Sequence, residues 1–574
     1  MIVWPLMRWL FFAACPLLAL LLAAGPATSA IKVDQVGYIA GAVKIAFVVT
    51  KSPASAFTLH RVRDGRVVFS GAADAPVDDR DSGDRVQALD FSAVRDTGSF
   101  YIDIPGVGTS WPFAIDRDPY ARTFYLAMRG FYGQRCGIAV DLGPAFPGFT
   151  HAACHVRGAY HVSSGKTGEA PSTRGWHDAG DYGRYVVNSA VASGTLLWAW
   201  ELFGTRVRRL TLDIPESQNA VPDILDEIKW NLDWMLSMQD RDGGVWHKQT
   251  SERFAAFVAP EADATISYII GTGVEPYKNS CATADLAAAM AVAARAYRPF
   301  DRAYSDRVLE AARLAWTWVA AHPSVVFENP GGVATGAYGD RSCSDELLWA
   351  AAELWRTTGE ALFHQYFLAH YGESLDTIRP AGPQSWSNVG PMALWSYALG
   401  RQTDARAAMF IRDRSRAAAD AIVERAARSG YRTTMTAADY VWGSNGVAAN
   451  YGVQLLIANA LHPDPRYVAT AIENLHYLLG RNAFSLSWLT QVGAHPFRHP
   501  HHRPSAADAK DEPWPGLLSG GPNARRQDPV MAKLPDLPPA RMYLDEQASY
   551  ATNEIAINWN AALVFLLAGV LTAR

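Results

Sequence analysis

The chain has 574 residues, of which 49% are hydrophobic and 19% are charged, and its formal net charge is −4 at pH 7. This composition is typical of globular proteins, and the length indicates several domains or one large helical domain with an appendage. The small negative charge provides no basic footprint and argues against nucleic-acid binding. Aromatic residues make up 11% of the chain. They can pack in a core or form flat platforms for sugar rings.

The first thirty residues have the pattern of a signal peptide. Arg8 is their only charge, an apolar run follows it, and small residues precede Ile31. The run is short for a membrane span, although an uncleaved anchor is the alternative. We expect cleavage after Ala30 and export to the periplasm or the extracellular medium, without membrane attachment afterwards.

From Ile31 to about Asp116 the sequence predicts short strands. Runs such as KIAFVV and GSFYIDIPG are broken by Gly, Asp, Ser and Pro. This spacing indicates a small antiparallel sandwich, so we place a first domain at 31–116. The segment holds no cysteine and no cluster of acids or histidines, and we expect no chemistry in it.

From residue 117 to residue 574 the sequence predicts helices. Apolar residues recur at i, i+3 and i+4 in segments such as VPDILDEIKWNLDWMLSMQ and CATADLAAAMAVAARAY. The number of such segments and the unequal loops between them favour a toroid of helical hairpins. A long stretch from Gly493 to Tyr543 is rich in Pro, His and Arg. Loops of that length are more often functional than idle.

Three clusters carry potential catalytic residues. The stretch RGWHDAGDYGRY places Asp178 and Asp181 three residues apart among aromatic side chains. The stretch HPHHRPS contains His501 and Arg503, and YLDEQASYATNEIAINWNA contains Glu554 before the last helix. Each cluster is weak alone, because Asp and Gly are ordinary turn residues and acids often stabilise helix N-termini.

Together the clusters resemble the active-site signatures of glycoside hydrolase family 9, the inverting cellulases. The third matches the family pattern throughout, whereas the second departs from it upstream, at His495. The resemblance covers roughly Tyr120 to the C-terminus, and the N-terminal part resembles the immunoglobulin-like domain of one branch of the family. It implies a small all-β immunoglobulin-like sandwich followed by an all-α (α/α)6 barrel, with endo-β-1,4-glucanase activity.

The resemblance also implies residue roles. Asp181 would be the general base, Asp178 would share the attacking water, and Glu554 would be the general acid. Inversion needs a protonated acid at the leaving oxygen and a carboxylate that activates water about 6.5–9.5 Å away. An aromatic-lined, partly desolvated site would favour a protonated Glu554.

Further residues are expected to bind the substrate, although helix packing is an equally good interpretation for any single tryptophan. The implied substrate-binding residues are His501, Arg503, His247, Trp246, Trp386, Trp442, Tyr550 and Asp545.

The cysteines suggest either disulfides or a metal site. Disulfides are the default in an exported protein, whereas two thiolates with two imidazoles suit structural zinc. The zinc site of the immunoglobulin-bearing branch resembles this set, and we favour zinc over a Cys136–Cys154 disulfide. The expected ligands are Cys136, Cys154, His155 and His177. Cys281 and Cys343 are free thiols or a bridge.

A calcium site is also implied by the resemblance. Asp345, Glu346 and Asn388 would supply hard oxygen ligands. The family usually has Asp in the segment where this chain has Ser387 and Asn388, so solvated helix-capping acids are the alternative. No GxGxxG, GxSxG or P-loop occurs, and no organic cofactor is expected.

Several alternatives stay open. A polysaccharide lyase would need a basic groove and would leave Glu554 without a task. A non-catalytic glycan-binding protein would not need intact acid and base positions. Within the hydrolases, an exo-acting cellodextrinase or β-glucosidase is the alternative to endo action, because cleft loops decide between them. We expect a monomer without a C-terminal cellulose-binding module, with a β-1,4-glucan or cello-oligosaccharide as substrate.

Overall fold

A computed structural model describes residues 26–571 of the chain, so most of the predicted signal segment lies outside the described residues. Residues just before the expected cleavage point lie on the sandwich, where Ala27 pairs with Thr109 and the amide of Thr28 donates to the Thr109 carbonyl. Cleavage after Ala30 would remove these contacts.

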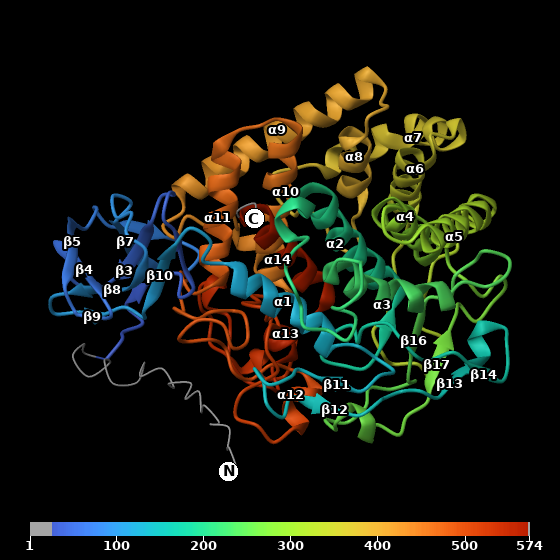
Figure 1. Cartoon of the computed structure of the whole chain (residues 1–574), viewed down its shortest axis with the longest axis horizontal. Helices are drawn as coiled ribbons and strands as arrows, with labels where there is room; N and C mark the ends of the chain where they lie inside the picture. Colours follow the sequence, from blue (N-terminus) through green and yellow to red (C-terminus); the bar gives the residue numbers. More distant parts are fainter. Residues whose placement is uncertain (1–25, 572–574) are drawn as a thin grey trace, which may run out of the picture.

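The N-terminal part is a β-sandwich, as predicted (Figure 1). One sheet has the order β1 (Ile31–Lys32), β3 (Ile45–Val49), β7 (Asp84–Asp90) and β6 (Val77–Asp79). The other has the order β2 (Gly37–Ile39), β10 (Phe113–Asp116), β8 (Gly98–Ile104), β4 (Ala56–Arg61) and β5 (Val67–Ala72), with β9 (Gly108–Thr109) beside β8. Alternation explains the core, since Phe100, Ile102 and Ile104 of β8 all point inward.

The rest of the chain forms an (α/α)6 barrel, also as predicted. The inner helices are α2 (Val186–Val207), α4 (Ser280–Tyr297), α6 (Ser344–Thr358), α8 (Gly390–Leu399), α10 (Ser444–Leu461) and α14 (Ile557–Val570). The outer helices are α1 (Ala121–Gly133), α3 (Asp223–Ser237), α5 (Arg302–Ala321), α7 (Ala361–Ser374), α9 (Ala405–Arg428) and α11 (Pro465–Leu478). The inner ring closes where α14 packs against α2.

Inner and outer helices of the barrel differ in how much of their surface is buried. Every residue of α4 from Ser280 to Ala294 is buried, as a helix enclosed by neighbours requires. Outer helix α9 buries only one stripe, which includes Ala408, Ile411 and Ile422. No helix within residues 26–571 combines the length and apolarity needed to cross a membrane.

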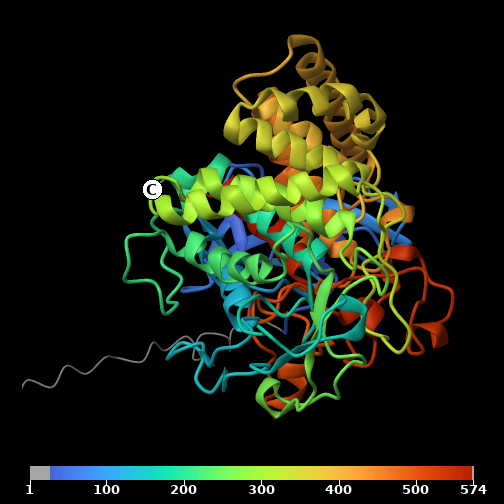
Figure 2. The same ribbon diagram turned by 90° about the vertical axis from the view of Figure 1, so that its right-hand side faces the viewer.

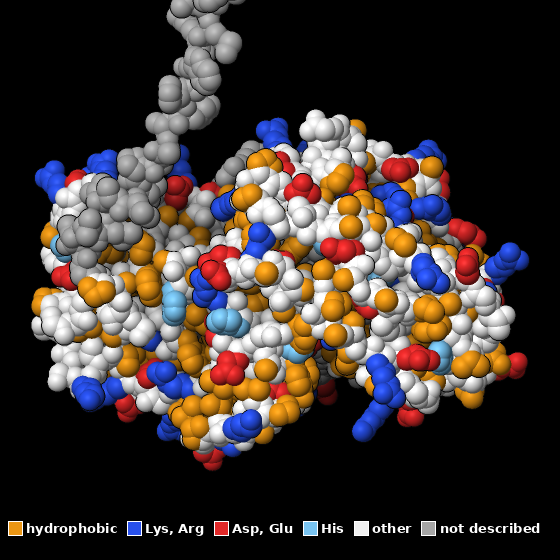
Figure 3. Space-filling view, turned by 90° about the horizontal axis from the view of Figure 1, so that it is seen from below, with side chains coloured by type: hydrophobic (Ala, Val, Ile, Leu, Met, Phe, Trp, Pro, Cys, Tyr) orange, Lys and Arg blue, Asp and Glu red, His pale blue; other side chains and the backbone are white. Residues whose placement is uncertain are grey.

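Loops and short strands gather at one end of the barrel, below the helices in Figure 2. One sheet there has the order β14 (Glu169–Ala170), β13 (Gly158–Tyr160), β17 (Ser267–Ile270), β16 (Lys248–Thr250) and β15 (Arg184–Tyr185). Nearby lie β11 (Val140–Asp141), β12 (Thr150–His151), α12 (Arg503–Ala507) and α13 (Tyr550–Asn553) (Figure 1). Figure 3 views the molecule from this side, where hydrophobic side chains lie among charged and histidine side chains. The sequence pattern did not predict this sheet.

Buried polar contacts hold the sandwich against the barrel. The Asp34 carboxylate accepts the hydroxyl of Tyr120 at 3.0 Å and lies 2.8 Å from Nδ1 of His476. Nζ of Lys32 donates to the carbonyl of Ala483 at 2.7 Å. Since unpaired buried polar groups are costly, these pairs fix the relative position of the two domains.

The structure also decides whether Cys281 and Cys343 are free thiols or a bridge. Cys281 and Cys343 form a disulfide between the first turn of α4 and the residue before α6. The bridge therefore ties two neighbouring inner helices together at their N-terminal ends.

Candidate active site

The turn that holds Asp178 precedes β15 and α2, and it buries this carboxylate to 1% exposure. Oδ1 accepts Nδ2 of Asn188 at 2.7 Å, and Oδ2 accepts the hydroxyl of Tyr338 at 2.6 Å. Burial and then the charge of Asp181 raise the pKa of Asp178 to about 7, although both donors lower it. The two donors thus define the orientation of the carboxylate.

Asp181 lies in the same turn and is also buried. Its Oδ2 accepts the hydroxyl of Tyr185 at 3.0 Å and the amide of Gly183 at 3.2 Å. Oδ1 is not used in these hydrogen bonds. An aspartate held in this way can present one oxygen to a water molecule in the cleft.

Glu554 lies between α13 and α14, far from the two aspartates in the sequence. Its Oε2 accepts Nε1 of Trp442 at 3.1 Å. Burial, and then the charges of Asp181 and Asp178, raise the pKa of Glu554 to about 8. Glu554 is therefore protonated at neutral pH and can donate a proton.

The three carboxyl groups share one cleft. Its other lining residues are Ala179, Tyr185, Phe254, Gly336, Ala337, Tyr338, Trp386, Trp442, Ala556 and Trp559. Aromatic walls with a few convergent polar groups are typical of sites that bind sugar rings.

Close backbone contact at Gly180 joins the first two sequence clusters. The Gly180 carbonyl accepts the backbone amide of Arg503 at 3.2 Å and its Nη1 at 2.7 Å. A Cβ at position 180 would lie 1.7 Å from the carbonyl oxygen of His501, so only glycine fits. The third cluster joins through the amide of Ile557, which donates to the Asp178 carbonyl at 2.9 Å.

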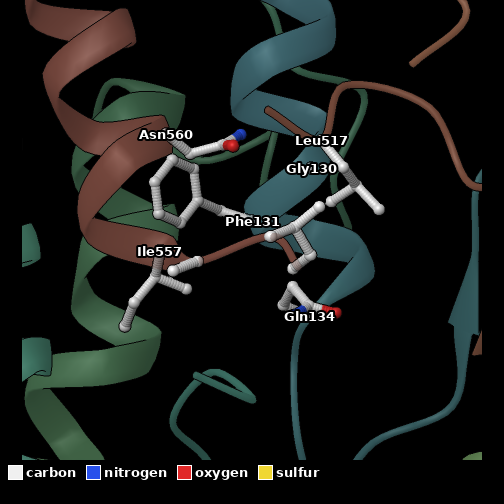
Figure 4. Close-up of a pocket in the computed structure, with 8 residues that line it drawn as sticks. Gly130, Phe131, Gln134, Leu517, Ile557 and Asn560 are labelled. Carbon is white, nitrogen blue, oxygen red and sulfur yellow. The ribbon is translucent and has the colours of Figure 1, made fainter. Parts of the chain in front are cut away.

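A small pocket behind this turn lies between α1 and α14 (Figure 4). Gln134 lines it, and its Nε2 donates to the carbonyls of His177 at 3.2 Å and Ala179 at 2.8 Å. Its Oε1 lies 2.9 Å from Nε2 of His502. Gln134 therefore supports the catalytic turn from behind.

The predicted substrate residues fall into different places. Trp386 and Trp442 line the cleft, and Tyr550 lies next to Trp442 with ring centroids 5.5 Å apart. Nδ1 of His501 lies 2.8 Å from the Gln547 carbonyl, and its ring contacts Tyr550.

Arg503 and Asp545 act on backbone in this structure. Besides Gly180, Arg503 donates through Nε to the carbonyl of Ala255 at 3.0 Å. Asp545 accepts the amides of Arg498 at 2.8 Å and His499 at 2.9 Å. Both side chains therefore position loops around the cleft.

The structure corrects the prediction for Trp246 and His247. Both are only 1% exposed, so neither offers a face to a sugar. Nε1 of Trp246 donates to the Ser164 carbonyl at 3.1 Å. His247 stacks on Phe327 with centroids 3.7 Å apart, and Nε2 lies 2.7 Å from the Ala337 carbonyl. Burial lowers the pKa of His247 to about 3, and its role is to support the loop that carries Tyr338.

Sequence reasoning missed several residues of the cleft. Tyr185 and Asn188 follow the aspartates closely and could have been found from that proximity. Tyr338 lies far away in sequence, at a positive φ of 45°, and Phe254 and Trp559 lie outside the three clusters. No local pattern distinguishes these three from core aromatics.

The four predicted zinc ligands come together. The ligand atoms of Cys136, Cys154, His155 and His177 all lie within 4.8 Å of one another. Both cysteines are free, so the alternative Cys136–Cys154 disulfide is not formed.

The donor set fits a metal ion. Nδ1 of His155 and Nδ1 of His177 are buried and without a hydrogen-bond partner. Nε2 of His155 lies 3.0 Å from a carboxylate oxygen of Asp263. An outer carboxylate of this kind typically orients a ligating imidazole. The cluster is therefore a candidate metal site.

The predicted calcium residues show a different arrangement. Asp345 accepts the amides of Val389 at 2.8 Å and Gly390 at 3.3 Å, at the N-terminus of α8. Glu346 is fully buried, and burial, followed by the nearby charges of Asp345 and Asp285, raises its pKa well above the usual range of a carboxyl group. Asp345 thus caps a helix, and calcium binding stays a prediction.

A glutamate with a raised pKa and two aspartates line one aromatic cleft on a helical barrel, and they supply the two kinds of carboxyl group that a glycoside hydrolase requires. Residues 120–567 match the family described as Glycosyl hydrolase family 9, and residues 26–109 match Cellulase N-terminal ig-like domain. The chain belongs to glycoside hydrolase family 9.

Similar proteins span nearly the whole chain. It is 36% identical over 550 residues to Endoglucanase D of Acetivibrio thermocellus, covering 94% of this chain and 83% of that protein. It is 34% identical to Cellodextrinase of Butyrivibrio fibrisolvens, covering 94% and 99%. The crystal structure of a Zn-binding triple mutant of endoglucanase J30 aligns with a TM-score of 0.86 at 34% identity, covering 93% and 100%.

Replacement of Tyr338 by Phe should lower kcat/KM about 10- to 150-fold, because a hydrogen bond to a charged group contributes about 1.5–3 kcal/mol. The donor lowers the pKa of Asp178, so its loss should also move the acidic limb of the pH profile to higher pH. Steady-state kinetics across pH would measure both effects. Tyr366→Phe on α7, whose ring packs on Trp316, is the matched control. An unchanged acidic limb in Tyr338→Phe would contradict this role.

Proposed function

We propose that this protein is an exported, inverting endo-β-1,4-glucanase that cleaves internal bonds of cellulose and related β-glucans. The observation that carries the proposal is that Glu554, with its raised pKa, lines the same cleft as the Asp178–Asp181 pair. The relative named Endoglucanase D supports endo action.

In the proposed reaction, Glu554 protonates the leaving glycosidic oxygen. Asp181 accepts a proton from water, which attacks the anomeric carbon from the opposite face. Asp178, fixed by Tyr338 and Asn188, accepts the other hydrogen of that water and aligns it. Trp386 and Trp442 supply flat surfaces for glucosyl rings.

A second candidate is exo-acting cleavage of cellodextrins. The relative named Cellodextrinase, which this chain covers almost fully, favours it. The same acid and base would act in both cases, so the two functions differ in where chains are cut.

The product mixture tests the proposed reaction. NMR should show the α-anomer first from a β-linked substrate, because one direct displacement inverts the anomeric carbon. Soluble carboxymethyl-cellulose should lose viscosity early, whereas exo action would release short sugars with little early loss. A β-anomer as first product would refute the inverting mechanism.

The acid role of Glu554 predicts a specific defect. Glu554→Gln should lower kcat about 10²–10⁴-fold, since an amide cannot protonate the leaving oxygen. A substrate with a good leaving group should recover part of the loss. The wild-type kcat/KM should fall as pH rises through about 8, where Glu554 loses its proton. Glu310→Gln, at an exposed position of α5, is the matched control. An equal loss with good and poor leaving groups would assign Glu554 another role.

We further propose that the cluster of Cys136, Cys154, His155 and His177 holds a structural zinc ion. Two thiolates and two imidazoles complete a tetrahedral shell, so zinc would act on structure and leave no position for substrate. His177 directly precedes Asp178, so the ion would fix the catalytic turn.

Elemental analysis should find one zinc ion per chain. His155→Ala should reduce the zinc content and lower the thermal unfolding temperature, because metal binding contributes directly to folding. His370→Ala, on the exposed side of α7, should change neither value. Purified wild-type protein without zinc would rule out this assignment.

We also propose that the two domains extend over 31–116 and 117–574, and that the mature protein acts as a monomer outside the cytoplasm. The end of β10 at Asp116 and the start of α1 at Ala121 support this division. We also propose calcium at Asp345, Glu346 and Asn388, next to the two backbone amides that Asp345 accepts in this structure.

A further inference from the structure

A long hairpin loop borders the catalytic cleft. Segment 251–266 connects the antiparallel strands β16 and β17 and contains only one short helical turn, Pro260–Ala262. Two of its phenylalanines are exposed, Phe254 by 51% and Phe257 by 38%. Exposed aromatic side chains that lie close together mark binding surfaces more often than isolated ones do.

Three contacts fix this loop to segments of the active site. Nε of Arg503 donates to the Ala255 carbonyl at 3.0 Å, and the hydroxyl of Tyr182 donates to the Val258 carbonyl at 2.5 Å. Further along, Asp263 lies 3.0 Å from Nε2 of His155 in the metal cluster. The loop is therefore held in one position relative to the catalytic carboxylates.

Both phenyl rings lie around the guanidinium of Arg503. Its Cζ is 4.9 Å from the ring centroid of Phe257 and 5.7 Å from that of Phe254. The Phe257 ring also meets the His501 ring edge to face, with centroids 5.0 Å apart. Cation–π and edge-to-face contacts hold the rings while leaving much of their surface free.

The rings continue the catalytic cleft. Phe254 lines it together with Asp181 and Glu554, and Phe257 lies beside the same arginine, further along the loop. A polysaccharide chain that crosses the catalytic residues must leave the cleft past its borders. This loop forms one such border.

We propose that Phe254 and Phe257 form an aromatic platform that binds glucosyl units of the β-1,4-glucan beyond those held at the catalytic carboxylates. The platform rests on the proposed function. Through this platform, Phe254 and Phe257 would determine the preference of the enzyme for long glucan chains.

Charge favours a neutral glucan as occupant. Arg503 is 5% exposed, and its Nε and Nη1 both donate to backbone carbonyls. The platform therefore offers apolar ring faces beside a largely buried guanidinium, which suits the CH face of a neutral pyranose better than an acidic glycan.

Chain-length dependence tests the platform. For Phe254→Ala/Phe257→Ala, the ratio of kcat/KM for cellohexaose to that for cellotriose should fall about tenfold relative to wild type, because the alanines remove both ring faces on which sugar units would stack. Phe254→Tyr/Phe257→Tyr keeps both rings and should retain the wild-type ratio. Phe300→Ala, in the short connection between α4 and α5, is the exposed-phenylalanine control.

The outcomes separate the platform from the proposed function. If the wild type is active and the alanine double variant keeps the wild-type ratio of kcat/KM for cellohexaose to that for cellotriose, the platform is wrong and the proposed function stands. A wild type inactive on all cello-oligosaccharides would overturn the proposed function. Loss of activity in the alanine variant without rescue by tyrosine, together with a lowered unfolding temperature, would assign the rings to folding and also overturn the platform.

Discussion

The active site depends on the contact at Gly180. Its carbonyl accepts two hydrogen bonds from Arg503, and the His501 carbonyl occupies the space that any side chain would need. Two residues before Gly180, the Asp178 carbonyl accepts the amide of Ile557 and brings in the segment of Glu554. Backbone hydrogen bonds thus position acid and base. Because these bonds are buried, rearrangement would leave polar groups unpaired at substantial cost.

The same burial gives the carboxyl groups different tasks. It raises the pKa of both Asp178 and Glu554, but Asp178 receives two side-chain donors that favour its ionised form. Glu554 receives one donor, from Trp442, and two neighbouring negative charges oppose its ionisation. Asp178 and Glu554 share one buried environment, but their different hydrogen bonds favour the ionised form of Asp178 and the protonated form of Glu554.

Sequence alone was informative where a pattern repeats or where a motif is contiguous. Periods of 2 and 3.6 residues predicted the sandwich and the helical toroid, and the aspartate turn and Glu554 belong to compact motifs. The five-stranded sheet near the cleft was missed because its strands are too short to show a period. Tyr338 was missed because only the fold brings it to Asp178. Trp246 and His247 were misassigned because sequence does not show which way a side chain points.

The metal cluster connects the catalytic turn to the hairpin loop that borders the cleft. His177 adjoins the catalytic turn, while His155 contacts Asp263 of the hairpin loop that carries Phe254 and Phe257. A closed set of four ligands offers no site for substrate, so its effect must act through these two connections. One bound ion would then hold the aspartates and the aromatic border in a common frame. Since water, sugar ring and leaving oxygen must align within a fraction of an ångström, such a shared anchor would directly serve catalysis.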